Sequence, residues 1–271
     1  MRETLRSSRR VVIKIGTSIL TSKKGLISRP VFERLAAEIA CLRQSQKQVT
    51  LVSSGAIAFG MEIQGFQKRP KLLSQLQACA AVGQNQLMQT YAEAFSKKKM
   101  TTAQILLTRD GLEDRGRFLA SRHTFTELFK MGALPIVNEN DSVATEEIAF
   151  GDNDILSVHV AHLVHADLLV ILSDVDGFYL LDGSRVREVL SEEDIDQRLS
   201  KHLKDTKKEK NVGGMKAKLA AARTAMRLGI PLVIMNGHQK GNLLKIFEGR
   251  DVGTLFCAAS EVRSKNKKLF S

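Results

Sequence analysis

Short apolar runs alternate along this chain with longer segments of helical periodicity, and this alternation restricts the possible folds more than any other feature. The runs are rich in β-branched residues, and most of them are almost continuously apolar, as expected of strands covered on both faces. They comprise Val11–Ile15, Val49–Ser53, Ala103–Leu107, Leu134–Val137, Leu168–Leu172 and Leu232–Met235. Alternating strands and helices favour a largely parallel sheet between helices. The sequence therefore predicts the α/β class, with a three-layer α/β/α sandwich.

The segments between these runs carry apolar residues at three- and four-residue steps, the spacing of an amphipathic helix. The predicted helices are Pro30–Ser45, Leu72–Lys98, Phe118–Met131, Asp154–His165 and Met215–Leu228. Ser28 is a candidate N-cap for the first, and Gly229 followed by Pro231 predicts the end of the last. The segment 145–151 suggests a hairpin. The polar, Lys-rich segment 200–212 suggests a mobile loop.

The length of 271 residues with 43% hydrophobic and 26% charged residues is ordinary for a globular protein. No linker-like stretch appears, so we expect a single domain over residues 1–271. Cys41, Cys79 and Cys257 lie far apart, which favours buried thiols in a reducing compartment. No apolar run is long enough for a membrane span or a signal peptide. We therefore predict a cytoplasmic protein with no membrane partner.

The formal net charge of +12 permits binding of anions, nucleic acid or a membrane surface. The basic residues fall in short clusters, however, and the chain has no Trp and only two Tyr. Stacking platforms for single-stranded nucleic acid are therefore unsupported. We interpret most of the charge as solvated surface charge and expect nucleic acid to be an unlikely partner.

Polar residues follow the predicted strands at their carboxyl ends, where open α/β sheets bind ligands. Lys14 interrupts the first apolar run and needs an anionic partner if buried. Gly16 would permit close approach of a ligand to the backbone. After the second run, Ser53–Ala56 leads into a helical segment, which favours an anion site at a helix N-terminus. Taken alone, it is equally well explained as a capping turn.

Four further polar clusters complete this pattern. They are Asn138–Asp141, Gly151–Asp154, Ser173–Gly177 and Gly213–Lys218. The first two suit binding of an amino group or organisation of lysines and magnesium, although capping alone would also explain the second. The last places glycines and lysines at a helix start, which is typical of a phosphate cradle.

Several common signatures are absent from the sequence. It contains no P-loop motif, no G-x-G-x-x-G and no H-E-x-x-H. The G-x-S-x-G elbow is also absent, because Leu51 stands where its first Gly would be. His159, His162 and His165 recur at three-residue steps without accompanying carboxylate or Cys ligands. A helix surface explains them better than a metal site.

Together and in this order, the motifs resemble the amino-acid kinase family, and within it the branch that phosphorylates glutamate. The match rests on 12–18, 52–57, 106–109, 113–119, 138–141, 151–154, 213–215 and 252–256, and it spans about 11–270. The first strand and the Gly-Gly loop are general to the family. The two Asn/Asp clusters and the 113–119 segment are much more specific to the glutamate branch.

The resemblance implies a role for each matching residue. Lys14 and Lys218 would stabilise charge on the transferring phosphoryl group, and Asp154 would orient them. The substrate-binding residues would be Ser54, Gly55, Asn138, Asp141 and Asn153. The nucleotide-binding residues would be Lys14, Gly16, Ser173, Asp174, Gly213, Gly214, Met215, Lys216 and Lys218. Since Ala217 stands where the family often has a small hydroxyl residue, Lys216 also remains a candidate for the second catalytic lysine.

The resemblance further implies ATP-dependent phosphorylation of the γ-carboxylate of L-glutamate, the first step of proline biosynthesis. ATP and Mg²⁺ would be required, with Mg²⁺ held mainly by the ATP phosphates and by no protein metal site. A homo-oligomer and feedback inhibition by proline are family expectations. The alternatives are another carboxylate or carbamate kinase of this fold, or a non-catalytic regulatory or RNA-binding module.

The expected domain has three portions: residues 8–170 for substrate binding, 171–260 for nucleotide binding and 261–271 as a basic tail. Many family members carry a further C-terminal PUA domain. This chain resembles the form that lacks it.

Overall fold

The computed structural model describes residues 2–22, 24–143, 153–180, 182–200 and 212–258. In this part of the chain, eight strands form one sheet in the order β3-β4-β2-β1-β5-β7-β8-β6. They are β1 (Arg10–Ile15), β2 (Gln48–Ser53), β3 (Thr102–Leu107), β4 (Leu134–Glu139), β5 (Leu168–Ser173), β6 (Glu188–Val189), β7 (Leu232–Asn236) and β8 (Thr254–Phe256). All neighbouring strands pair in parallel except β7 and β8, which are antiparallel.

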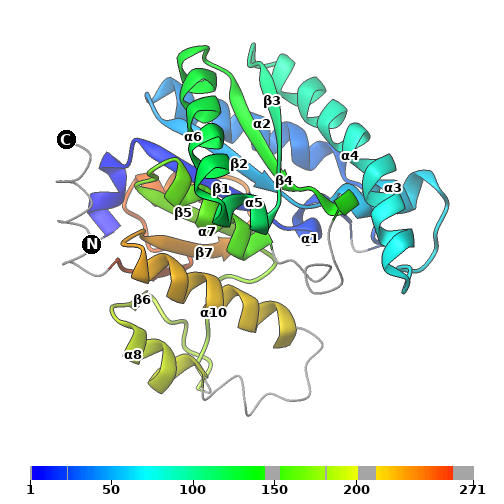
Figure 1. Cartoon of the computed structure of the whole chain (residues 1–271). Helices are drawn as coiled ribbons and strands as arrows, with labels where there is room; N and C mark the ends of the chain where they lie inside the picture. Colours follow the sequence, from blue (N-terminus) through cyan, green and yellow to red (C-terminus); the bar gives the residue numbers. More distant parts are fainter. Residues whose placement is uncertain (1, 23, 144–152, 181, 201–211, 259–271) are drawn as a thin grey trace.

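The helices and helical turns connect these strands (Figure 1). They are η1 (Arg2–Ser7), α1 (Thr17–Leu20), α2 (Arg29–Gln44), α3 (Ala56–Ile63), α4 (Leu73–Ser96), α5 (Arg109–Glu113), α6 (Arg115–Lys130), η2 (Asp141–Val143), α7 (Asn153–Leu163), α8 (Glu192–Asp194), η3 (Ile195–Ser200), α10 (Val212–Arg227) and α11 (Asn242–Phe247). None of the helices described is both long and apolar enough to cross a membrane.

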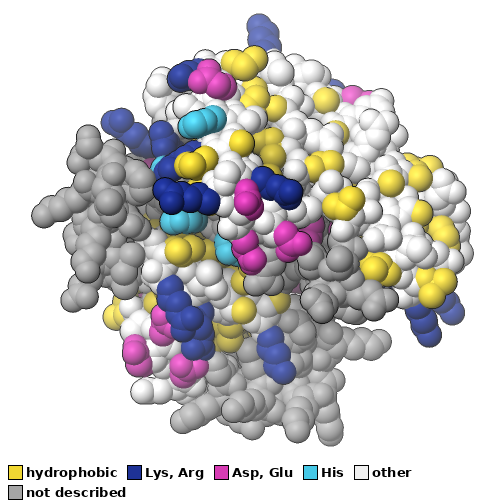
Figure 2. All heavy atoms as spheres, in the orientation of Figure 1, with side chains coloured by type: hydrophobic (Ala, Val, Ile, Leu, Met, Phe, Trp, Pro, Cys, Tyr) yellow, Lys and Arg dark blue, Asp and Glu magenta, His cyan; other side chains and the backbone are white. Residues whose placement is uncertain are grey.

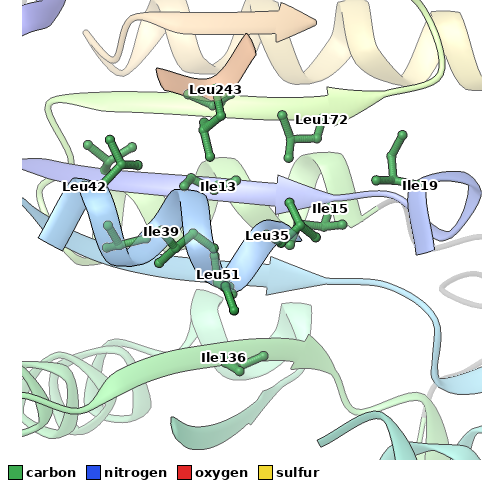
Figure 3. Packing of buried hydrophobic residues seen from close by; sticks show 14 of the residues in the cluster. Ile13, Ile15, Ile19, Leu35, Ile39, Leu42, Leu51, Ile136, Leu172 and Leu243 are labelled. Atoms are coloured by element: carbon green, nitrogen blue, oxygen red, sulfur yellow. The ribbon is translucent and has the colours of Figure 1, made fainter. Parts of the chain in front are cut away.

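Two hydrophobic clusters lie on opposite faces of the sheet, because successive strand residues point to opposite sides. On one face, Ile13 and Leu51 pack with residues of α2, α4 and α11. Figure 3 shows Leu35 and Ile39 of α2 lying over these strands. On the other face, Val12 and Val52 pack with residues of α6, α7 and α10. This arrangement confirms the predicted three-layer α/β/α sandwich.

The order of the strands places a topological switch beside β1. The chain passes from β1 to β2 on one side, whereas β5 pairs with β1 on the other. In sheets of this kind, ligands bind in the crevice beyond the carboxyl ends of the strands at the switch point. The residues that end β1, β2 and β5 therefore lie where a sheet of this kind binds its ligand.

The surface charge is divided among separate groups on the face drawn in Figure 2, where acidic side chains stand between the basic ones. Arg223 and Arg227 of α10, for example, form ion pairs with Asp196 and Glu192 at 2.6 and 2.7 Å. This distribution agrees with the interpretation of the basic excess as surface charge.

All six predicted strands and all five predicted helices are present, with ends that differ by no more than a few residues. The two-residue β6 and three-residue β8 were not predicted, because they are too short to form an apolar run. The prediction that strands are covered on both faces is wrong for β3, an edge strand on which Gln104 and Leu106 are exposed. Ser28 occupies the N-cap of α2 but makes no capping side-chain hydrogen bond.

The three cysteines do not all lie where the sequence predicts. Cys79 and Cys257 are buried, but Cys41 is exposed, so the prediction of three buried thiols is wrong for Cys41. Cys41 points outward because Ile39 and Leu42 occupy the inner face of the same helix. The hairpin at 145–151, positions 201–211 of the expected loop and the basic tail at 261–271 lie outside the described residues.

Candidate active site

Lys14 stands near the end of β1 and is almost completely buried. Its side chain is 7% exposed, and its Nζ lies 2.5 Å from Oδ1 of Asp154, which is fully buried at the start of α7. A buried ammonium group requires such a partner, since an unpaired one would be strongly unfavourable. The anionic partner that the sequence required for Lys14 is therefore Asp154.

Lys218 completes a three-residue ionic cluster around the same carboxylate. Its Nζ lies 3.3 Å from Oδ2 of Asp154 and 3.4 Å from the carbonyl oxygen of Gly214, one turn earlier in α10. The side chain of Lys216 is exposed instead. Two residues differ by about 200° around a helix axis, so both lysines cannot face Asp154. The geometry favours Lys218 over Lys216 as the second lysine of the site.

The charge state of Asp154 follows from two opposing effects. Burial alone would raise its pKa, but the ammonium groups of Lys14 and Lys218 outweigh that effect and hold the pKa of Asp154 below its ordinary value. The carboxylate is therefore ionised at neutral pH. The cluster carries one net positive charge at the carboxyl edge of the sheet.

Next to this cluster, three polar side chains from three elements form a hydrogen-bonded group. The Nδ2 atom of Asn153 donates to Oγ of Ser54 at 2.9 Å, to Oδ1 of Asn138 at 3.0 Å and to the carbonyl oxygen of Ser53 at 3.3 Å. Asn153 and Asp154 are consecutive, so the start of α7 belongs to both groups. Asn153 therefore does more than cap a helix.

The turn that carries Ser54 has a backbone that only glycine adopts readily. Gly55 has φ of 119°, and it is the N-cap of α3. The N–H of Ser54 donates to the carbonyl oxygen of Ile15 at 3.0 Å, which joins the ends of β1 and β2. The first N–H groups of a helix have no acceptor within it, so the start of α3 favours an anion.

Asp141 follows β4 in the short turn η2, which lies against α4. Burial raises the pKa of Asp141 to about 6, and the nearby Arg69 partly opposes that shift. A carboxylate held in this state is a candidate partner for a ligand ammonium group, which would favour its ionised form. Asp141 makes no contact with Ser54 or Asn153 that the structure records.

Of the residues expected to bind nucleotide, Gly16, Ser173 and Asp174 lie at or beside the end of β5. The N–H of Gly16 donates to the carbonyl oxygen of Leu172 at 3.3 Å, and a Cβ atom at Gly16 would lie 3.8 Å from Nζ of Lys14. Such an atom would fill the space in front of that ammonium group. Ser173 is buried and donates to Asp174, which is exposed. Gly213, Gly214 and Met215 lie in the first turn of α10.

Two residues of α4 that support the site were not anticipated from the sequence. Gln84 accepts a hydrogen bond from Nδ2 of Asn138 at 2.8 Å. The hydroxyl of the fully buried Tyr91 is hydrogen-bonded to Oγ of Ser53 at 2.8 Å. Gln84 and Tyr91 are seven residues apart and so share one face of the helix. That spacing is the only sequence signal for them, and it is equally typical of core packing.

Within the described residues, no group of three or more His, Cys, Asp or Glu side chains is placed to hold a metal ion. His159, His162 and His165 are half-buried along and just beyond α7, and His162 lies against Phe118. Gly151 and Asp152, part of the second Asn/Asp cluster, lie outside the described residues.

Comparison with known proteins finds the amino acid kinase family and relatives that are named glutamate 5-kinase. The model of the amino acid kinase family matches residues 9–236. A glutamate 5-kinase from Geobacter metallireducens is 45% identical over 266 residues, which cover 97% of this chain and 71% of the relative. A glutamate 5-kinase from Thermus thermophilus is 42% identical over 267 residues, with the same coverage of 97% and 71%.

The fold has a counterpart among solved structures. The crystal structure of UMP kinase from Bacillus anthracis matches with a TM-score of 0.60 and 18% identity, covering 93% of this chain and 97% of that one. At this identity, the likeness concerns the fold alone. With a family model that matches most of its length and relatives above 40% identity, this chain belongs to the amino acid kinase family.

Proposed function

We propose that this chain transfers the terminal phosphoryl group of ATP to the γ-carboxylate of L-glutamate and produces L-glutamyl 5-phosphate, the first step of proline biosynthesis. The observation that carries this proposal is the pairing of Lys14 and Lys218 with one buried carboxylate, next to the Ser54–Asn153 group. Relatives that are named glutamate 5-kinase support the choice of substrate.

The chemistry needs alignment and charge neutralisation rather than a general base. A glutamate side chain ionises near pH 4.3, so it is already a nucleophile at neutral pH. The main obstacle is repulsion between this carboxylate and the triphosphate. Lys14 and Lys218 would offset that repulsion and stabilise the charge that develops on the transferring group. Asp154 would hold both ammonium groups at fixed positions.

The substrate amino acid would bind at the neighbouring group. Ser54, Gly55 and the start of α3 offer donors for its α-carboxylate, and Asn138, Asn153 and Asp141 offer acceptors for its ammonium group. The nucleotide would lie over Gly16, Ser173 and Asp174, with its phosphates toward the start of α10. These assignments place the two substrates on either side of the Asn153–Asp154 pair.

Mg²⁺ would accompany the nucleotide, since phosphate oxygens are ligands that this ion prefers. We expect the cation to be held mainly by the ATP phosphates. When bound, the ion would supply further charge neutralisation to the phosphoryl group.

Release of ADP with Mg²⁺ and ATP tests the proposal directly. The acceptors to compare are glutamate, aspartate, acetylglutamate, carbamate and UMP, each over the same concentration range. We expect kcat/KM to be highest for glutamate by at least about tenfold. Preferred turnover of another acceptor would assign the chain to a different kinase of this fold, and absence of turnover with all five would refute a kinase.

Three further properties belong to this proposal. A homo-oligomer is an expectation from the family resemblance. Sedimentation analysis would test it. Feedback inhibition by proline is expected from the family, and a cytoplasmic location remains a prediction from the sequence.

A further inference from the structure

Helix α4 lies unusually close to the turn that carries the substrate-binding residues. A Cβ atom at Gly83 would come within 1.9 Å of the carbonyl oxygen of Ala56, the first residue of α3. At Gly60 of α3, a Cβ atom would lie 1.8 Å from the carbonyl oxygen of Cys79. Only glycine at both positions allows this distance between the helices. The residue after Gly83 is therefore held next to the site.

That residue, Gln84, belongs to a chain of side-chain amides whose directions are fixed by the backbone. The N–H of Glu139 donates to Oδ1 of Asn138 at 2.9 Å, so Nδ2 of Asn138 must face Oε1 of Gln84. In the same way, the carbonyl oxygen of Ser53 can only accept, which identifies the donor of Asn153 as Nδ2. The amide order thus runs from Gln84 through Asn138 to Asn153.

Two buried polar atoms remain at the ends of this chain. Among the described residues, neither Nε2 of Gln84 nor Oδ1 of Asn153 has a hydrogen-bond partner, although both atoms are inaccessible to solvent. A buried unpaired polar atom is unfavourable, and such atoms in folded proteins usually have a functional explanation. One is a donor and the other an acceptor, which matches the opposite needs of a carboxylate and an ammonium group.

We propose that Gln84 is a positioning residue for the substrate amino acid. Its Oε1 holds Asn138, and Asn138 in turn holds Asn153, whose buried Oδ1 is the acceptor end of the chain. This inference rests on the proposed function and adds a residue outside the strand-end motifs. Loss of the Gln84 acceptor would leave the buried Nδ2 of Asn138 unpaired, which would weaken the hold on Asn138 and, through it, on Asn153.

The test compares Gln84→Met with Gln89→Met. Methionine has nearly the volume of glutamine and a similar helix propensity, but it lacks the acceptor. Gln89 lies on the exposed side of α4, where its amide donates to Glu93 at 3.1 Å. We expect Gln84→Met to raise the KM for glutamate by about tenfold, the effect of one lost hydrogen bond at a buried site. We expect kcat and the KM for ATP to change by less than about threefold, and Gln89→Met to leave all three unchanged.

A double-mutant cycle with Asn138→Leu shows whether Gln84 acts through Asn138. In the Asn138→Leu background, Gln84→Met should have no further effect on the KM for glutamate. Equal and additive effects in both backgrounds would contradict the proposal. So would an unchanged KM for glutamate in Gln84→Met, or a parallel rise of both KM values together with a lower Tm, which indicates a structural role only.

The proposal can still be tested if Gln84→Met does not fold or if the wild type prefers another acceptor. If Gln84→Met does not fold, Gln84→Asn takes its place, because it keeps an amide but withdraws it by one methylene. If the wild type prefers another acceptor of the panel, the proposed function fails, and the same variants are compared with that acceptor. A selective rise in the acceptor KM would then still support Gln84 as a positioning residue. If no acceptor is phosphorylated, both proposals fail.

Discussion

Replacement of Asp154 by Asn is the perturbation that most directly examines the ionic cluster. The carboxamide has almost the same shape as the carboxylate, so packing at the start of α7 is retained. The change removes one negative charge between two ammonium groups, whose nitrogens lie 2.5 and 3.3 Å from the carboxylate oxygens. Lys14 and Lys218 would then repel each other in a buried site.

The loss of stability expected for Asp154→Asn depends more on the burial of the charges than on the distances between them. With an effective dielectric constant of about 20, each ion pair at these distances has a Coulomb energy of roughly 5–7 kcal/mol, and desolvation of the buried groups offsets most of it. Removal of one partner from a buried pair typically costs about 3–5 kcal/mol. We therefore expect the Tm of the free protein to fall by about 6–15 °C. The loss should be smaller with Mg²⁺ and ATP present, because the triphosphate provides the lysines with another counter-ion.

The pH dependence of this loss has a definite sign. The pKa of Asp154 is lowered in the folded state, so its stabilising effect is present above the unfolded pKa, about 3.9 for Asp. The effect disappears as the pH falls through the lower folded pKa. The difference in Tm between wild type and Asp154→Asn should thus be large at pH 7 and shrink under strongly acidic conditions.

Thermal unfolding followed by circular dichroism, together with ADP release, measures both consequences. Glu127→Gln is a matched control, because its pair with Lys130 at 2.8 Å is about two-thirds exposed and should contribute less than about 1 kcal/mol. We expect kcat of Asp154→Asn to fall by about 10²–10³. A Tm within about 2 °C of wild type and a near-normal kcat would refute the assigned arrangement.

Three other perturbations examine separate parts of the site. Lys14→Met and Lys218→Met should each lower kcat by about 10²–10³, whereas Lys216→Met should change it by less than about tenfold; steady-state ADP release distinguishes them. For Asp141, whose pKa is raised to about 6, kcat/KM for glutamate should fall as the pH drops below that value, and Asp141→Asn should give a weaker, pH-independent response in the same profile. Gly83→Ala should lower the free energy of unfolding by about 1–3 kcal/mol and raise the KM for glutamate, since the new methyl group would push α4 away from α3; denaturant titration and kinetics check both effects.

The central strands could be predicted because each is marked by a local apolar run in the sequence. β1, β2, β4, β5 and β7 are buried on both faces, and that environment requires a continuous apolar run that any reader of the sequence can find. The strand β3 broke the rule because it lies at the edge, where Gln104 and Leu106 face outward. β6 depends on pairing with β8, which lies 67 residues further along the chain, as between Glu188 and Leu255. β8 also pairs with β7 across 20–24 residues, and both strands are too short for a local pattern to announce them.

Some residues of the site could be predicted from the direction of the strands, whereas others depend on how the helices are rotated and packed. Lys14, Ser54 and Asn138 follow from strand direction alone, because the carboxyl ends of parallel strands meet at one edge of a sheet. The choice between Lys216 and Lys218 depends instead on the rotation of α10 about its axis, and the contact of Gln84 depends on how closely α4 approaches α3. Both are properties of packing between elements, which propensities and motifs do not contain. A residue that supports a site from a neighbouring helix therefore looks like any other helical residue until the helices are placed, and Gln84 is such a case.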